Sequence, residues 1–311
     1  MHVSRLSPKP LLACFLVIGL ALSACGKEEK LPDVGKLIAQ LQDQELPQRT
    51  RAANLLAKHG PRAATAIPAL LDATDFPEPP PASGKKKKAK NDAKPAPTQE
   101  ELEAQAFDAI VKALSRMGKD GVPELMKGLE RPDHRASWAA MTALAWIGQP
   151  AVPALIEGLK TDNDQVRDLS ATSLAAMGER GAEAIPALVE TARGRLGSAS
   201  GQAIVALGKM GGAAVPALME MLADQKMNPR RQEVIVAIGQ LGGAAKPAVP
   251  TLLSELEHPD EEIRLATVRA LGKIGPAAEA AIPKLMSLEK DQRTQIAKVA
   301  EKALNQIAPN R

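Results

Sequence analysis

Aromatic residues are scarce in this chain. They make up 2% of 311 residues, and tyrosine is absent altogether. The strands of β-sandwiches and barrels favour aromatic and β-branched side chains. Proteins that bind single-stranded nucleic acids stack the bases on aromatic side chains. The composition therefore argues against both classes.

Cysteine is nearly as rare, and both residues, Cys14 and Cys25, lie near the N-terminus. Two cysteines do not build a disulfide framework, and neither belongs to a CxxC or CxxCH motif. The four histidines form no HExxH motif and do not stand beside glutamates at metal-ligand spacing. We therefore predict that the protein has no metal site and no cofactor.

No catalytic motif is recognisable either. The segment 197–201 resembles a nucleophile elbow only superficially, because its central residue is Ala199 and no strand precedes it. The glycine pairs at 211–212 and 242–243 follow helical patterns rather than strands, so they do not predict phosphate-binding loops. We expect no catalytic residues.

The net charge gives no indication of nucleic-acid binding. The formal charge is +4, of which Arg5 and Lys9 supply two. A lysine-rich segment at 74–100 supplies the other two, since it holds six lysines and four acidic residues. The rest of the chain is net neutral, whereas a nucleic-acid-binding solenoid would carry a basic stripe.

The N-terminus has the three regions of an export signal. Arg5 and Lys9 precede an apolar run from Leu11 to Leu22, which is shorter than the roughly 20 residues of a membrane span. The run ends in Leu22-Ser23-Ala24-Cys25, which resembles a bacterial lipobox.

The lipobox resemblance implies that residues 1–24 are a removed signal peptide and that Cys25 is the lipidated first residue. Residues 25–33 would then form a tether. Gly26 favours the outer membrane by the family's sorting rule, with the protein facing the periplasm. The alternative is an ordinary signal peptide with an incidental cysteine.

A repeat of about 30 residues fills most of the remaining chain. The string Ala-Ile-Pro-Ala-Leu occurs at 66–70 and at 184–188. Close variants are centred on Pro123, Pro153, Pro216, Pro250 and Pro283. A glycine closes each Leu/Ala-rich run, namely Gly60, Gly118, Gly148, Gly178, Gly211, Gly242 and Gly275. A fixed period of this length is typical of solenoid proteins.

The unit 149–178 predicts a helical hairpin. Pro153 suits the first turn of a helix, whose apolar face would be Val152, Leu155, Ile156 and Leu159. A turn at 161–164 follows, with Asp164 as the expected N-cap. The second helix would run from Gln165 to Met177 and end at Gly178. Its expected inner stripe is Val166, Ser170, Leu174 and Met177.

These units resemble HEAT repeats, especially those named after the phycobilisome lyases. The segments 260–264 (Asp-Glu-Glu-Ile-Arg) and 270–275 (Ala-Leu-Gly-Lys-Ile-Gly) match that pattern nearly throughout, whereas the turns at 198–200 and 228–231 depart from it. The resemblance implies an all-α fold. The expected architecture is a right-handed α-α superhelix of about eight hairpins over 34–308, with the second helices lining the concave side.

A Pro/Lys-rich insertion at 74–100 interrupts the second unit. It holds six prolines and no apolar stripe, which predicts a disordered linker, and a helical pattern resumes over 101–117. The insertion carries the residues Lys85, Lys86, Lys87, Lys88 and Lys90. They are either a solvated loop or a contact for an anionic surface.

Several outward positions of the second helices are apolar, and we predict that they bind a protein partner through the concave face. The candidates are Trp138, Met141, Thr142, Trp146, Leu169, Ile204, Val205, Ile235, Val236 and Arg269. Two alternatives remain open. Neighbouring units bury these residues, or the helical register is shifted by one residue, which would bury half of them.

The predicted function is therefore a lipid-anchored envelope scaffold that binds another protein and has no intrinsic catalysis. Membrane contact would come through the lipid anchor, and neither nucleic acid nor metal is expected. The HEAT resemblance leaves a second possibility, a lyase or chaperone-lyase for bilin-bearing proteins, although an export signal argues against cytoplasmic substrates. A third possibility is a structural envelope protein whose lysine-rich loop contacts anionic polymers.

Overall fold

The computed structural model describes residues 31–76, 97–194, 198–290 and 295–309. The chain divides into two units, Met1–Leu31 and Pro32–Arg311, and the second contains nearly all of the described residues. The predicted signal peptide, the predicted lipidation site Cys25 and the lysines at 85–90 lie outside the described residues. The fold described below is that of the second unit.

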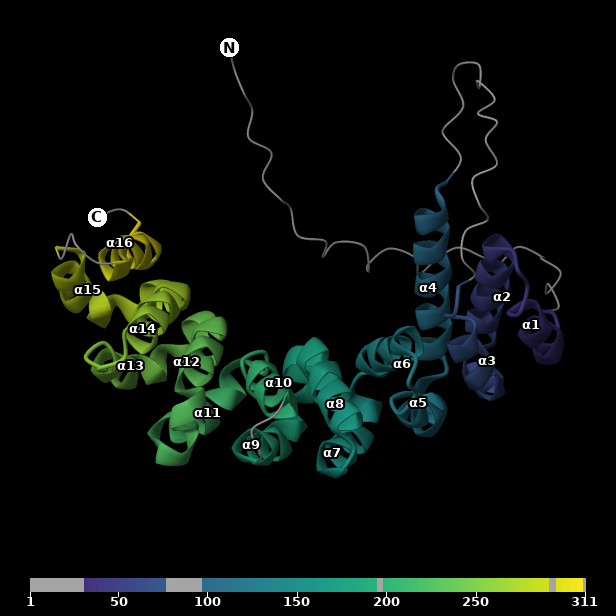
Figure 1. Ribbon diagram of the computed structural model, residues 1–311, viewed down its shortest axis with the longest axis horizontal. Coiled ribbons are helices and arrows are strands. Elements are labelled where there is room, and N and C mark those ends of the chain that lie inside the picture. The colour runs from purple at the N-terminus through teal and green to yellow at the C-terminus, as the bar shows by residue number, and fades with distance from the viewer. Residues whose placement is uncertain (1–30, 77–96, 195–197, 291–294, 310–311) are drawn as a thin grey trace, which may run out of the picture. The chain divides into compact units, whose positions relative to one another are not determined.

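The described residues of this unit form sixteen α-helices in eight consecutive hairpins (Figure 1). The first helices of the hairpins are α1 (Val34–Gln40), α3 (Ile67–Asp72), α5 (Val122–Gly128), α7 (Val152–Lys160), α9 (Ile185–Arg193), α11 (Val215–Ala223), α13 (Val249–Glu255) and α15 (Ile282–Glu289). The second helices are α2 (Leu46–His59), α4 (Gln99–Arg116), α6 (His134–Ile147), α8 (Asp164–Met177), α10 (Ser198–Leu207), α12 (Arg231–Gln240), α14 (Glu261–Ile274) and α16 (Gln295–Ile307). The predicted all-α superhelix of about eight hairpins is confirmed.

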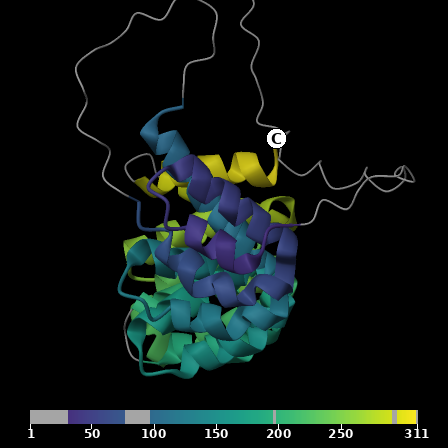
Figure 2. The ribbon, with the colours of Figure 1, turned by 90° about the vertical axis from the view of Figure 1, so that its right-hand side faces the viewer.

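Each second helix packs against the second helix of the next hairpin, from α2 against α4 to α14 against α16. Figure 1 shows these helices in one row and the first helices in another. Turned by 90°, the same helices are seen with the first hairpins in front of the later ones (Figure 2). Each hairpin thus buries its apolar stripes against its neighbours in the chain, as in other solenoids.

A glycine with positive φ ends the hairpin in each of the first seven units. All seven glycines identified from the sequence have φ between 57° and 76°. Residues with a Cβ atom rarely adopt this conformation, so glycine is the residue that allows the sharp turn here. A short 3₁₀ segment then leads into the next first helix, as at Gly178–Ala184.

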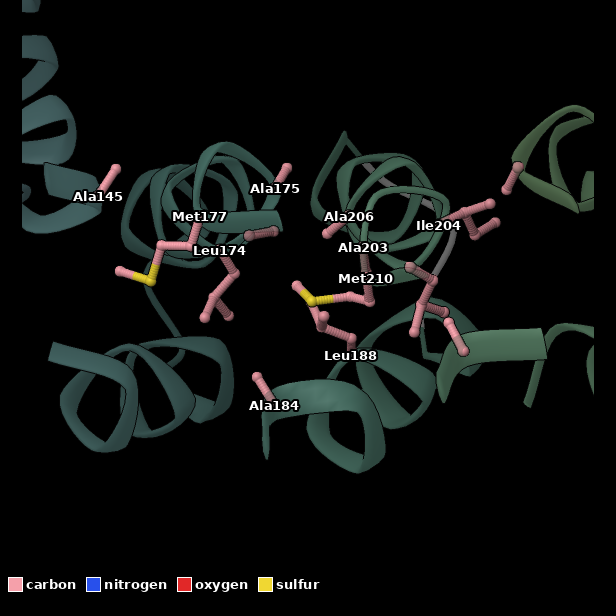
Figure 3. Packing of buried hydrophobic residues seen from close by; sticks show 14 of the residues in the cluster. Ala145, Leu174, Ala175, Met177, Ala184, Leu188, Ala203, Ile204, Ala206 and Met210 are labelled. Carbon is pink, nitrogen blue, oxygen red and sulfur yellow. The ribbon is translucent and has the colours of Figure 1, made fainter. Parts of the chain in front are cut away.

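A proline lies in the first turn of every first helix from α3 to α15. The leucine two residues later is completely buried in each of these helices: Leu70, Leu125, Leu155, Leu188, Leu218, Leu252 and Leu285. Figure 3 shows Leu188 near the side chains of Leu174, from α8, and Met210, which follows the end of α10. The proline therefore starts the helix and the leucine carries its packing.

Unit four confirms the predicted inner stripe of its second helix and corrects one cap. Val166, Ser170, Leu174 and Met177 are all buried. The N-cap of α8 is Asn163 rather than the predicted Asp164, because the Asn163 Oδ1 atom accepts hydrogen bonds from the backbone N–H groups of Gln165 and Val166. Asp164 is the first residue of the helix and pairs with Arg167.

The folded part of unit two extends into both ends of the predicted linker at 74–100. Thr74 is completely buried. At the other end, α4 begins at Gln99, because Thr98 and Glu101 form a capping box in which each side chain accepts the other residue's backbone N–H. The segments 74–76 and 98–100 therefore belong to the packed structure.

Among the described residues, no single helix combines the length and the apolar character needed to cross a membrane. One bent pair of helical segments, His134–Ile147 with Gln149–Lys160, has the length and composition of a membrane span, but its two halves are bent by 118°.

Candidate partner-binding surface

The structure divides the predicted partner-binding residues into exposed and buried positions. Trp138 and Trp146 are 43% and 56% exposed. Val205, Val236 and Arg269 are also exposed, and Thr142 and Leu169 are half-buried. In contrast, Met141, Ile204 and Ile235 are at most 3% exposed. These three residues belong to the core, so the prediction that they face a partner from exposed positions is wrong.

Helix geometry explains this division. Ile204 and Val205 are consecutive residues of α10, so their side chains point about 100° apart around the helix axis. Ile204 packs inside the core (Figure 3), whereas Val205 faces solvent. Met141 with Thr142 and Ile235 with Val236 repeat this pattern. Burial by neighbouring units, which the sequence analysis left open for all of these residues, therefore applies to one residue of each of these three pairs. The sequence did not show this, because both members of each pair are apolar or small.

Three residues of the predicted set form a single stripe on α6, in which both tryptophans are exposed and Thr142 is half-buried. Trp138, Thr142 and Trp146 follow one another at intervals of four residues, so they lie on one face over about 12 Å. Farther along the row, Val205 and Val236 line a groove of about 330 Å³ between α10 and α12. The exposed apolar residues of the predicted set thus lie in two places, on α6 and between α10 and α12.

Trp138 also forms part of a larger cleft of about 700 Å³ between α4, α6 and the end of the 74–76 segment. We call this the aromatic cleft. Its lining residues are Phe76, Glu100, Glu103, Ala104, Phe107, Asp108, His134, Arg135 and Trp138. The described part of the chain contains four phenylalanine and tryptophan residues, and three of them line this cleft. Aromatic residues are thus concentrated here, in a chain that is only 2% aromatic.

One face of α4 supplies the acidic wall of the aromatic cleft. Its residues 100, 103, 104, 107 and 108 recur at the three- and four-residue intervals that share a helix face. The capping box at Thr98 extends α4 far enough for Glu100 and Glu103 to lie on this wall. The helices α4 and α6 are direct neighbours in the stack, which brings the acidic wall opposite α6.

Arg135 connects the two sides of the aromatic cleft. Its guanidinium carbon lies 5.1 Å from the centre of the Phe76 ring, within the range of a cation–π interaction. An Nη2 atom of the same group is 3.4 Å from the Glu103 carboxylate. On the α6 side, the ring centres of His134 and Trp138 are 6.1 Å apart.

The remaining acidic groups of the aromatic cleft are not neutralised in the same way. Its lining includes three carboxylates and one guanidinium. Glu103 pairs with Arg135, whereas Glu100 and Asp108 form no ion pair with any residue that the structure describes. The lining is therefore net negative and partly aromatic.

The sequence analysis found only Trp138 in this cleft. Phe76 lay inside the predicted linker. A usable signal was nevertheless present, because Phe107, Glu100, Glu103 and Asp108 share one helix face. What the sequence did not reveal is that this face lies opposite Trp138.

Metal-binding geometry is not found in the described parts of the chain, where no three His, Cys, Asp or Glu side chains could hold an ion together. Two histidines there have structural contacts instead. The Nε2 atom of His59 lies 2.9 Å from the Pro32 carbonyl oxygen, and the Nδ1 atom of His258 accepts the backbone N–H of Asp260. The absence of metal and cofactor in the whole protein stays a prediction.

Comparison with protein families identifies the fold class. The family model for HEAT repeats matches residues 104–175, 152–239 and 229–305, which together cover more than half of the chain. The chain therefore belongs to the HEAT-repeat family, as its Pro-Ala-Leu and closing-glycine motifs predicted. No curated protein sequence matches it significantly.

Solved structures with a similar fold include two karyopherins. Kap121p bound to the extreme C-terminus of the phosphatase Cdc14p is 14% identical, with a TM-score of 0.48, and the match covers 89% of this chain and 33% of that one. Kap95p, from a study of RanGDP switch loops, is 11% identical, with a TM-score of 0.46 and coverages of 88% and 42%. The chain thus spans about a third to two fifths of the length of these karyopherins.

A third similar structure is the CpcE–CpcF complex of phycocyanin lyase from Nostoc sp. PCC7120. It is 20% identical, with a TM-score of 0.31, and the match covers 93% of this chain and 100% of that one. These likenesses concern the fold alone.

Proposed function

We propose that this protein is a lipid-anchored scaffold of the bacterial cell envelope, which binds a protein partner through the exposed side chains of its second helices. A HEAT-repeat solenoid is suited to protein interaction, because stacked hairpins present an extended surface, and such scaffolds are typically non-catalytic. The observation that carries the proposal is the exposure of both tryptophans, Trp138 and Trp146, on one face of α6.

Exposed tryptophans are unusual where nothing binds them. Tryptophan is enriched among the few residues that dominate the affinity of protein interfaces, where it fills pockets of the partner. Thr142 lies between the two tryptophans on α6, and the exposed Arg269 lies farther along the row, on α14. Neither residue brings negative charge to the surface. The α6 stripe is therefore the strongest candidate for the centre of the interface.

The interface is testable by crosslinking in cells followed by mass spectrometry. We expect the double variant Trp138→Ser, Trp146→Ser to recover its specific partner at least tenfold less efficiently than the wild type, since residues of this kind contribute about 2 kcal/mol or more each. The matched control is Met286→Ser, which changes a residue that is 42% exposed on α15, in the row of first helices. Circular dichroism would verify that both variants fold.

The control should retain the partner. If the tryptophan double variant also retains it at wild-type yield, the second-helix surface is not the interface and this part of the proposal fails.

The lipid anchor is supported by the lipobox-like residues Leu22-Ser23-Ala24-Cys25. Acylation by more than one chain would hold the protein stably at a membrane. We expect Cys25→Ser to move the protein from the membrane fraction to the soluble fraction and to abolish labelling with a radioactive fatty acid. The control is Cys14→Ser, which changes a cysteine inside the predicted signal peptide and should leave both readouts unchanged.

Membrane association and labelling that survive Cys25→Ser would exclude this anchor. The orientation towards the periplasm and the preference for the outer membrane are parts of the same proposal. Lyase activity and the contact of the lysine-rich segment with anionic polymers stay predictions, since no described residue favours either.

A further inference from the structure

We propose that the aromatic cleft binds an arginine- or lysine-bearing segment of the protein partner. This inference rests on the proposed function, because it assigns a ligand chemistry to one part of the same surface. The evidence for it is the aromatic and acidic side chains that line the aromatic cleft, rather than the volume of the cleft.

Arg135 shows within the molecule how this cleft holds a cation. Its guanidinium group lies over the face of Phe76 and against the carboxylate of Glu103, at 5.1 Å and 3.4 Å. A planar, weakly hydrated guanidinium is suited to stacking on an aromatic ring while donating hydrogen bonds to a carboxylate. One aromatic ring and one carboxylate of the aromatic cleft are thus already occupied by a positive charge.

The same combination occurs a second time in the aromatic cleft without a described cation. Phe107 and Trp138 supply aromatic surface, and Glu100 and Asp108 supply carboxylates. Trp138 is 43% exposed, so its ring is accessible from solvent. Neither carboxylate has an ion-pair partner among the described residues, which leaves this second set free to receive a charge from outside the described structure.

Charge complementarity selects the occupant. A neutral apolar segment would desolvate Glu100 and Asp108 without compensation, which is costly. An anionic segment would meet like charges. A segment with arginine or lysine side chains would form charge-assisted hydrogen bonds with the carboxylates and cover the aromatic rings with its aliphatic stems. The volume of about 700 Å³ falls within the range of pockets that hold several side chains or a small ligand.

The test uses the fluorescence of Trp138 in a Trp146→Phe background, where Trp138 is the only tryptophan of the chain. The probe is an acetylated and amidated peptide with three arginines separated by glycine–serine pairs. We expect saturable binding that weakens as salt is added, because the ion pairs are partly exposed. The same peptide with citrulline in place of arginine should bind at least tenfold more weakly.

The carboxylates are tested by the double variant Glu100→Gln, Asp108→Asn, which removes both charges and keeps the side-chain shapes. We expect about a tenfold loss of affinity for the arginine peptide. The matched control is Asp120→Asn, Glu279→Gln. It removes the same charge from exposed residues outside the aromatic cleft, so its affinity should change less than twofold.

Equal binding of the citrulline peptide, or an equal loss in both double variants, would overturn the proposal. A third result would also overturn it. If the arginine peptide bound neither the Trp146→Phe protein nor its Glu100→Gln, Asp108→Asn variant, and changing Lys85–Lys88 to Gln altered the fluorescence spectrum of Trp138, the chain's own lysines would be the occupant. The two proposals can fail separately. A partner that depends on Trp138 and Trp146 but not on Glu100 and Asp108 supports the scaffold and excludes the cationic ligand.

Discussion

At the scale of single residues, the closing glycines are positions where the backbone conformation itself disfavours a side chain. Gly178 has φ of 59° and ψ of −136°. A Cβ atom added there would lie 3.3 Å from the Lys209 carbonyl oxygen of the next unit. The residue therefore combines a backbone conformation that disfavours side chains with a close approach between neighbouring units.

We expect Gly178→Ala to lower the free energy of unfolding by about 1–3 kcal/mol, because alanine would be strained at this φ. The matched control is Gly243→Ala, whose added Cβ atom would meet nothing within 4 Å and whose φ is not positive. It should be neutral or slightly stabilising. Urea denaturation of both variants measures the difference, and an equal effect of the two substitutions would show that backbone strain is not the cause.

Residue-level surface exposure is also where prediction from sequence failed. Every residue pair such as Met141–Thr142 or Ile204–Val205 was recognised as part of a second helix, but only the stacking of the next helix decides which member is covered. A rotation of about 100° separates a core residue from a surface residue. Hydrophobicity does not resolve this rotation where both neighbours are apolar, as in Ile204–Val205.

At the scale of elements, the contacts between hairpins include one largely buried ion pair. Arg231, the first residue of α12, forms two hydrogen bonds to Glu255, the last residue of α13, at 2.8 Å (Nε–Oε2) and 2.6 Å (Nη2–Oε1). The Glu255 side chain is only 8% exposed. Hydrogen bonding to Glu255 raises the pKa of the Arg231 guanidinium, so this arginine carries its charge at neutral pH.

We expect Arg231→Met to destabilise the protein by about 3 kcal/mol, because it leaves the Glu255 carboxylate buried without its cation. The control is Lys160→Met, which removes an exposed lysine paired with Glu157 and should cost less than about 1 kcal/mol. Thermal unfolding at neutral pH compares the two. An equally small effect of both substitutions would mean that the pair between α12 and α13 adds no more than a surface contact.

The helices themselves were predictable because their signals are local. Proline in the first turn, the leucine two residues later and the closing glycine all act within one hairpin, so they identify a unit without knowledge of its neighbours. The cap of α8 was misplaced by one residue, since Asn163 and Asp164 are both good capping residues and only the backbone geometry distinguishes them.

At the scale of the whole molecule, each hairpin depends on its neighbours and the ends need polar caps. The helix α16 buries Ile296, Ala300 and Leu304 against the preceding unit. Its opposite side carries the exposed residues Lys298, Glu301, Lys302 and Asn305. The last hairpin therefore covers the apolar surface of α14 and presents charge to solvent.

Removal of residues 276–311 should expose this surface of α14. We expect the truncated chain to unfold at lower urea concentration and to self-associate, because α14 would lose its apolar cover. Analytical ultracentrifugation and urea titration measure both effects. A truncated chain that stays monomeric with an unchanged unfolding midpoint would show that the last hairpin is not a required cap.

The sequence by itself determined the repeat, the all-α class, the number of hairpins and the prolines and glycines that mark them, because each of these depends on interactions within about 30 consecutive residues. Only the tertiary structure decided which apolar residues of the second helices reach solvent. It alone also brought Phe76 together with Phe107 and Trp138. Phe76 and Trp138 are 62 positions apart in the chain and meet only because hairpins two and three stack, and such a contact has no local signal in the sequence.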